Sequence, residues 1–354
     1  MHLAFPARRS VTLAALAAAA LLASCAQPPP PAPPPPPPPV SLSSRLIEQA
    51  RAYRADVDHG SAISPDFTSG QEVSDAVRTG AAYQPDQLLR GAIVFGAVAA
   101  LQDPAYVAGV RIYAADATQR QKIAYEIMKD PAYAVGITGS ASAAGLVIAA
   151  LGHDGGKLLD QGRLVKQAAY KVQASAWSKG EVAGRDARLL QAKQLSTQPG
   201  LGETAETARL QQASVGAAPL GLNGAAVAPP YSPLVIRSLA LAALAALGYG
   251  DDANLDTITP LVTDPSSATC LNMSKLNLYQ CLAVAKPYYE DVFCLGQHVL
   301  QDTGICLIKG VGLPVPPDPI LEAAKARAAE AAAAKATKAT KASAKGSKSK
   351  RAKH

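Results

Sequence analysis

Four cysteines near the end of the chain are the group whose type and spacing point most directly to chemistry. A stretch of 37 residues holds Cys270, Cys281, Cys294 and Cys306. Thiols grouped in this way either bind a metal or oxidise in pairs to disulfides. Zinc sites use closely spaced cysteine pairs, with about two to four residues between the two ligands, and this segment has no such pair. We therefore expect two disulfides and no metal site.

The spacing of these cysteines favours one pairing. Residues 11 positions apart on one helix, such as Cys270 and Cys281, lie about 16 Å apart, which is too far for a disulfide. The pairs Cys281–Cys294 and Cys270–Cys306 share almost the same midpoint at Pro287, so a helical hairpin turning there would set both pairs opposite each other. The pattern resembles twin-cysteine helical hairpins, with slightly longer spacings. We favour these nested pairs, and sequential pairing stays open should the second helix end early.

The histidines and hydroxyl groups form no catalytic pattern. We interpret His153 and Asp154, in a glycine-rich stretch, as a solvated turn at a helix end. We interpret His298 as a structural residue of a cysteine-rich helix. The nucleophile motif Gly-x-Ser-x-Gly does not occur. The sequence therefore gives no catalytic residue and no cofactor.

The C-terminal segment is strongly basic. Residues 321–354 contain ten Lys and Arg against two Glu, a net charge of +8, and they contain no aromatic residue. Residues 320–334 have high helix propensity, and the Lys-Ala-Thr repeat that follows predicts a disordered polycation. Such a tail binds polyanions, and a solubilising role is the alternative. The cations that we assign to polyanion binding are Lys335, Lys338, Lys341, Lys345, Lys348, Lys350, Arg351 and Lys353.

The N-terminus carries an export signal. Arg8 and Arg9 precede an apolar run, residues 11–23, that is too short to span a bilayer. The segment Leu-Ala-Ser-Cys that ends at Cys25 resembles the lipobox of bacterial lipoproteins. This resemblance implies cleavage before Cys25 and its acylation with chains such as palmitate, which anchor the protein in a lipid bilayer. Because Ala26 is not the Asp of inner-membrane lipoproteins, the resemblance implies the outer membrane, with the body in the periplasm or, alternatively, at the surface.

A proline run separates this anchor from the rest of the chain. Residues 28–39 contain eleven prolines and one alanine, which form an extended polyproline II spacer about 37 Å long. Beyond the signal and the basic tail, 22 basic and 25 acidic residues remain, a slight acidic excess. This charge does not fit a nucleic-acid-binding domain, and export removes DNA as a native partner.

The body has the composition of packed helices. Hydrophobic residues make up 49% of the chain and aromatic residues only 5%, so small side chains supply much of the apolar content. Residues 132–152 carry no charge, and we expect a tightly packed central helix pair there rather than a membrane span. The fold class that we predict is all-α, a multi-helix bundle or irregular helical array with a disulfide-stapled hairpin and disordered termini. Helical spacing or capping signals occur at 44–58, from Ser69, at 87–101, 118–129 and 158–177, and from Ser232 to Gly248.

These features divide the chain into six parts. The long irregular stretch in the middle reads as a boundary between two helical parts or as a partner-binding loop. The parts are 1–24, signal peptide; 25–42, lipid anchor and spacer; 43–195, helical domain; 196–231, loop or linker; 232–312, helical subdomain with four cysteines; and 313–354, disordered basic tail.

The arrangement predicts a structural tether or interaction scaffold. A lipid anchor, a stiff spacer, a stapled body and a polycation follow one another along one chain, so the tail would contact peptidoglycan or another envelope polyanion. One alternative is an envelope assembly or binding factor whose unknown protein partner binds the helical body. An envelope enzyme is a further alternative, for which the sequence offers no motif.

Overall fold

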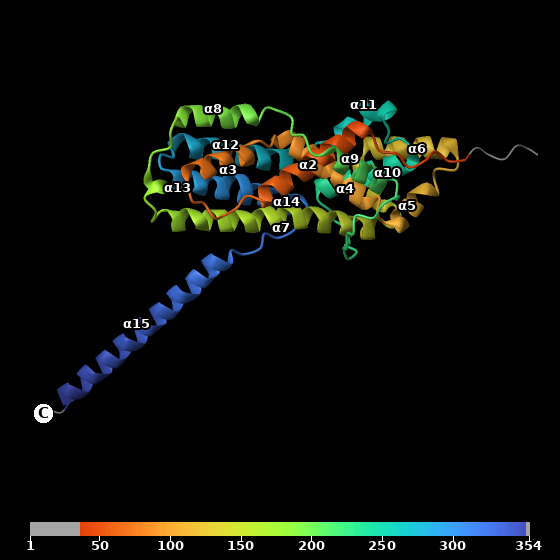
Figure 1. The fold of residues 1–354 in the computed structure, drawn as a ribbon. Coiled ribbons are helices and arrows are strands. Elements are labelled where there is room, and N and C mark those ends of the chain that lie inside the picture. The colour runs from red at the N-terminus through yellow and green to blue at the C-terminus, as the bar shows by residue number, and fades with distance from the viewer. Residues whose placement is uncertain (1–35, 352–354) are drawn as a thin grey trace, which may run out of the picture. The chain divides into compact units, whose positions relative to one another are not determined.

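The structure is a computed structural model that describes the backbone of residues 36–351 and the side chains up to Lys335 (Figure 1). The signal peptide and Cys25 therefore lie outside the described residues. Within them the fold is all-α. The elements are α2 (Ser44–Ser61), α3 (Gly70–Ala81), α4 (Pro85–Ala100), α5 (Pro104–Arg111), α6 (Ala117–Lys129), η1 (Pro131–Gly136), α7 (Ser140–Val172), η2 (Trp177–Lys179), α8 (Arg185–Leu195), α9 (Thr204–Ser214), α10 (Pro233–Leu247), η3 (Asp252–Asn254), α11 (Leu255–Ile258), η4 (Thr259–Val262), α12 (Pro265–Val284), α13 (Tyr288–Cys294), the π-helical turn η5 (Leu295–Gln301), α14 (Asp302–Gly310) and α15 (Pro319–Arg351).

Local capping explains where many helices begin. The side chains of Ser69, Asp103 and Ser232 each accept a hydrogen bond from a backbone N–H in the first turn of α3, α5 and α10. Such caps satisfy donors that have no partner inside the helix. Gly248, with φ of +82°, ends α10 in the left-handed conformation that favours glycine. The helix start at Ser69 and both ends of the helix at 233–247 are confirmed.

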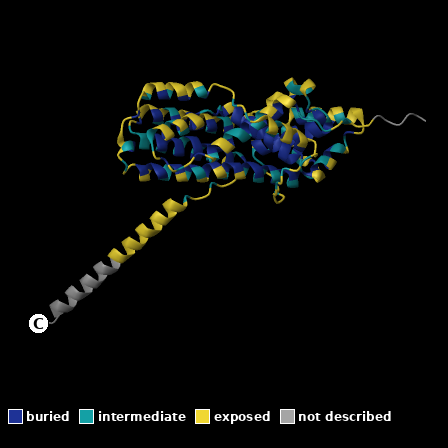
Figure 2. Cartoon of the chain, in the orientation of Figure 1, coloured by how far each residue is buried: buried dark blue, intermediate teal, exposed yellow. Residues whose placement is uncertain are grey.

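The core is built around α4 and α10. From Leu88 onward every side chain of α4 except Arg90 is buried, and α10 is buried at 12 positions. Figure 2 shows this concentration of buried residues in the body. Helices apolar around most of their circumference are core helices, so the predicted burial of 87–101 is confirmed.

Glycines let α7 approach the last body helices closely. A Cβ added at Gly155 would lie 2.9 Å from the carbonyl oxygen of Gly304, and one at Gly162 would lie 2.6 Å from the backbone nitrogen of Gln301. Only glycine fits where two helix backbones meet at this distance. The interpretation of the glycine-rich stretch at His153 as a helix end is therefore wrong, because its glycines lie inside α7, where Gly155 serves packing.

The cysteine-rich region is the stapled helical hairpin that the sequence predicts. Helix α12 runs into a turn at residues 285–287, and α13, η5 and α14 return along it. Cys270 is bonded to Cys306, and Cys281 to Cys294, with Cα–Cα distances of 5.7 Å. These are the nested pairs that the spacing favours. Sequential pairing stayed open only if the second helix of the hairpin ended early. Helix α14 instead continues past Gly304 to Gly310.

Helices on both sides of the 196–231 segment share one core. The described residues from Pro38 onward form one compact unit, in which α10 packs on α4. The segment contains α9 and then an irregular stretch that runs along α7. The Val227 N–H donates to the carbonyl of Ala141, so this stretch lies against the body.

In residues 36–351 no single helix is both long and apolar enough to cross a membrane. Within these residues, α4 and α5 taken together have the length and apolar composition of a membrane span, and the chain bends by 87° between them.

Helix α15 begins at Pro319, one residue before the segment 320–334 of high helix propensity, and continues to Arg351. Every side chain described in it, from Pro319 to Lys335, is exposed (Figure 2). It therefore has helix propensity without a buried face, as expected for a segment rich in alanine and lysine.

Candidate functional site

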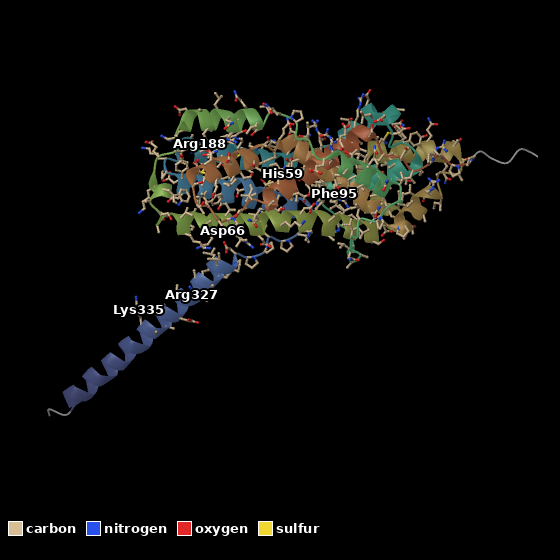
Figure 3. All side chains as sticks on the ribbon, in the orientation of Figure 1. His59, Asp66, Phe95, Arg188, Arg327 and Lys335 are labelled. Atoms are coloured by element: carbon tan, nitrogen blue, oxygen red, sulfur yellow. A yellow bond between two sulfur atoms is a disulfide. The ribbon has the colours of Figure 1, made fainter. Side chains whose placement is uncertain are left out.

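The residues assigned to polyanion binding lie on α15 or beyond it. Lys335 is exposed, and Figure 3 shows its side chain and that of Arg327 projecting from the helix. Lys353 lies outside the described residues. Only the backbone is described for Lys338, Lys341, Lys345, Lys348, Lys350 and Arg351, which all belong to α15.

Helix α8 fastens the closed end of the disulfide hairpin. Arg185 donates through Nε to the carbonyl of Ala285 at 3.0 Å and through Nη2 to that of Ala283 at 3.1 Å. These carbonyls belong to the end of α12, where helical acceptors have no partner within the helix. The Val182 N–H donates to the carbonyl of Lys286 at 2.8 Å. The turn of the hairpin is therefore held by residues far from it in sequence.

A buried ion pair adds to this attachment. Arg188 of α8 binds both carboxylate oxygens of Asp291 of α13, and it also donates to the carbonyl of Leu282. The Asp291 side chain is fully buried. Burial raises the pKa of Asp291 to about 6, while the charge and hydrogen bonds of Arg188 lower it. The pair is a costly feature to bury, and no local pattern predicts it, because the two residues are 103 positions apart.

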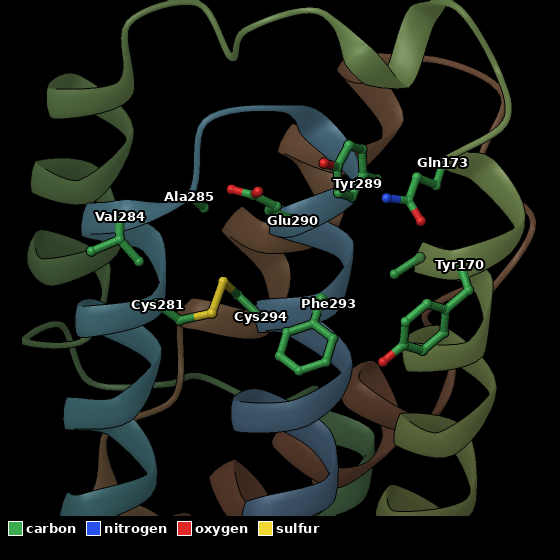
Figure 4. Close-up of a pocket in the computed structure, with 10 residues that line it drawn as sticks. Tyr170, Gln173, Cys281, Val284, Ala285, Tyr289, Glu290, Phe293 and Cys294 are labelled. Atoms are coloured by element: carbon green, nitrogen blue, oxygen red, sulfur yellow. A yellow bond between two sulfur atoms is a disulfide. The ribbon is translucent and has the colours of Figure 1, made fainter.

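An open apolar groove of about 510 Å³ lies beside the inner disulfide. Figure 4 shows it between α7 and the hairpin, with Tyr170 on one side and Phe293 on the other. Val284 is 74% exposed and Tyr170 is 56% exposed. The backbone N–H of Lys286 donates to Glu290, the charged residue among those lining the groove. Nothing in the described part of the chain identifies what covers this surface.

The site of His153 and Asp154 differs from the sequence interpretation. Asp154 is 2% exposed and accepts hydrogen bonds from Tyr53 at 2.9 Å and Arg54 at 2.7 Å. His153 is exposed and lines a cavity with Asp154. The solvated turn is therefore wrong for Asp154, which is the centre of a buried polar network. The sequence could not reveal this network, because its members lie about 100 residues apart.

His298 belongs to a smaller polar cluster in the π-helical turn. Its Nδ1 lies 2.8 Å from Oδ2 of Asp302, and Gln297 donates to the other oxygen of the same carboxylate at 2.9 Å. Lys166 of α7 donates to Gln297 at 2.7 Å. The interpretation as a structural histidine accounts for these contacts. The signal for the Asp302 contact was available, because residues four apart lie on one face of a helix.

Asp56 and Lys275, two residues whose charges interact, have no counterpart in the sequence expectations. Lys275 is 4% exposed, donates to the carbonyl of Ala81 at 2.9 Å and lies 3.4 Å from the ring centroid of Tyr83. Burial raises the pKa of Asp56 to about 7 and lowers that of Lys275 to about 7, and the attraction between the two charges opposes both shifts. Perturbed groups of this kind occur at functional sites and in structural networks alike.

The described residues contain no group of three or more His, Cys, Asp or Glu that could hold a metal ion. Comparison with models of protein families, with curated proteins and with solved structures gives no match to this chain. Its function is therefore inferred from its own residues.

Proposed function

We propose that the protein is an outer-membrane lipoprotein that acts as a tether or scaffold in the periplasm. Cys25 carries the acyl chains, the proline run is the spacer, and the basic tail binds an anionic envelope component such as peptidoglycan. The observation that carries the proposal is α15, whose described side chains are all exposed and which lies in a segment, residues 321–354, with a net charge of +8. A helix without a buried face contributes little to the core, so its charge is available for a partner.

The attachment of the spacer to the body supports a tethering role. Arg111 donates to the carbonyl of Pro38 at 3.0 Å, and the Ser41 N–H donates to that of Ala245 at 3.2 Å. Ser43 and Ser44 both donate to the carboxylate of Asp252. The chain that leaves the proline run is therefore fixed at several points before α2 begins, as a linker that holds a body in place requires.

The two disulfides support an exported protein. Structural disulfides persist in oxidising compartments such as the periplasm and are rare in the cytosol. The nested pairs Cys270–Cys306 and Cys281–Cys294 therefore agree with the export signal.

Co-sedimentation with purified peptidoglycan sacculi tests the tail. The mature chain is compared with a variant that ends at Pro319 and with a full-length variant in which the eight assigned cations are replaced by Gln. We expect the mature chain to bind at low salt and to be released as salt rises, because screening weakens charge contacts. Both variants should remain in the supernatant. Equal sedimentation of all three chains would contradict the proposal.

Fractionation tests the anchor separately. The wild-type chain should incorporate labelled palmitate and fractionate with the outer membrane, whereas Cys25→Ser should do neither. Labelling of the two chains to the same extent would reject acylation at Cys25 and leave the result for the tail unaffected.

A further inference from the structure

A polar cavity of about 540 Å³ lies between α2, α4, α7, α9 and the loop at 220–223. We propose that this cavity binds a small organic oxyanion, a carboxylate or phosphate attached to an apolar group. Its volume falls within the range of about 300–1,000 Å³ that small-molecule sites occupy. It is separate from the basic tail, so this inference does not rest on the tethering function.

Arg54 is a cation of the cavity that is held in place before any ligand binds. Its Nη1 donates to Asp154 at 2.7 Å and its Nη2 to Asp58 at 3.2 Å, and its guanidinium carbon lies 5.0 Å from the ring centroid of Phe95. Its Nε is buried and has no acceptor in the described part of the chain. A guanidinium held rigidly at the wall of a cavity is well suited to bind an oxyanion.

The network behind Arg54 has little value for stability alone. Tyr53, fully buried, donates to the same oxygen of Asp154 that accepts from Arg54. Burying an ion pair costs about as much free energy as the attraction returns, so apolar residues would stabilise the core equally well. What the network does provide is a fixed position for the Arg54 guanidinium in the cavity.

Two further cations lie among the residues that line the cavity. Lys157 is exposed on α7, one turn beyond His153. Arg209 of α9 is oriented by Glu206, to which its Nε and Nη2 donate at 2.7 Å each, and its Nη1 is not part of that pair. Three of the lining residues are cations and one, Asp154, is a carboxylate. Arg54 pairs with Asp154 and Asp58 and Arg209 pairs with Glu206, whereas Lys157 forms no ion pair within the described residues. This lining favours a negative ligand.

Part of the remaining wall is apolar and preformed, and it is supplied by Phe95, Ala149, Ala150, Leu220 and Leu222. His153 and Asn223 add polar groups to the lining. The loop that carries the two leucines is fixed, because the Leu220 N–H donates to Gln102 at 2.9 Å. Further along the segment, a Cβ added at Gly224 would lie 2.3 Å from the carbonyl oxygen of Gly145. A ligand with an apolar group beside its charge would therefore meet both surfaces without rearranging the loop.

Calorimetric titration of the full mature chain tests the proposal. The probes are phenyl phosphate and N-acetyl-leucine, which represent the two oxyanions, and N-acetyl-leucinamide is the uncharged control. We expect at least one anion to bind with a dissociation constant of about 1 mM or tighter, and the amide at least about tenfold more weakly. The stronger of the two anions identifies the head group. Equal binding of the amide, or binding of neither anion, would overturn the proposal.

Variants locate the binding site. Lys157→Ala combined with Arg209→Ala removes two exposed cations of the cavity and leaves the buried Arg54 network intact. We expect affinity to fall by about tenfold or more. Lys171→Ala is the matched control, since Lys171 is exposed on the same helix but does not line the cavity, and its affinity should equal that of the wild type. Unchanged affinity in the double variant would place any binding outside the cavity, for example on the tail, and would reject the proposal.

Discussion

Asp56 has a buried carboxyl group, and its protonation links folding to pH. The pKa of Asp56 is about 7 in the folded chain, whereas an exposed Asp carboxyl, as in the unfolded chain, has a pKa of 3.8. Between these values the unfolded chain loses the proton while the folded chain keeps it. The free energy of unfolding therefore falls as pH rises from about 4 to 7. We expect Asp56→Asn to flatten this slope, by at most about 1.4 kcal/mol per pH unit, in urea unfolding at pH 5, 6 and 7. Parallel slopes in the two chains would contradict this.

Lys275 gives the complementary prediction at higher pH. Its pKa is about 7 in the folded chain and 10.5 as the reference, so the unfolded chain binds the additional proton between these values. Stability should therefore rise with pH from about 7 to 10. Lys275→Met should remove that rise. Asp291 is present in the wild type, in Asp56→Asn and in Lys275→Met. Its contribution to the pH dependence of stability is therefore the same in the three chains.

The ion pair of Arg188 and Asp291 predicts an asymmetry between single and double substitutions. Arg188→Ala leaves a carboxylate buried without its cation, and we expect a loss of about 3–5 kcal/mol in the free energy of unfolding. Combining Arg188→Met with Asp291→Leu replaces both charges by apolar groups and should recover most of this loss. Urea unfolding with the disulfides intact measures both. A double variant less stable than the single one would show that the pair stabilises the fold.

At the scale of the helices, the glycines of α7 allow a matched comparison. Gly162→Ala would place a Cβ 2.6 Å from backbone of the facing helix, so the helices must separate, at a cost of about 1–3 kcal/mol. Gly156→Ala meets nothing within 4 Å and should gain up to about 1 kcal/mol from helix propensity. Thermal unfolding of the two variants tests this. A similar change in both would contradict a packing role for Gly162.

The helices that could be predicted from the sequence are those with local signals. Apolar periodicity identified α2 and α4, and capping residues identified α3 and α10. The glycines of α7 could not be interpreted from the sequence in this way. Those near His153 suggested a helix end, since a sequence does not reveal which backbone will approach them. Helix propensity is a local property, whereas the contact of Gly155 with Gly304 is formed only by tertiary packing.

At the scale of the whole molecule, the basic tail and the cavity differ in how far the sequence could predict them. The positive charge of the tail follows from its amino-acid composition, so it can be counted directly along residues 321–354. The cavity draws on α2, α4, α7, α9 and a loop, and one of its cations, Arg54, pairs with a residue 100 positions away. Only the folded chain brings these groups together. The disulfide pairing was easier to predict than the cavity and harder than the tail. The symmetric spacing of the four cysteines indicated a hairpin and favoured the nested pairs without excluding the alternative.

The outer disulfide has a mechanical consequence if the chain is held at both ends. Arg111 binds the carbonyl of Pro38 at one end of the body, and Arg163 binds the carbonyl of Pro316 at 2.6 Å at the other. A pulling force applied to the chain beyond these two points would pass through the disulfide directly from Cys270 to Cys306. The 36 residues of sequence separation between them would bear no load, and about 120 Å of contour length would stay out of the stretched chain. The hairpin and the groove beside its inner disulfide would then keep their shape while the rest of the body was pulled, until a reductant released that length.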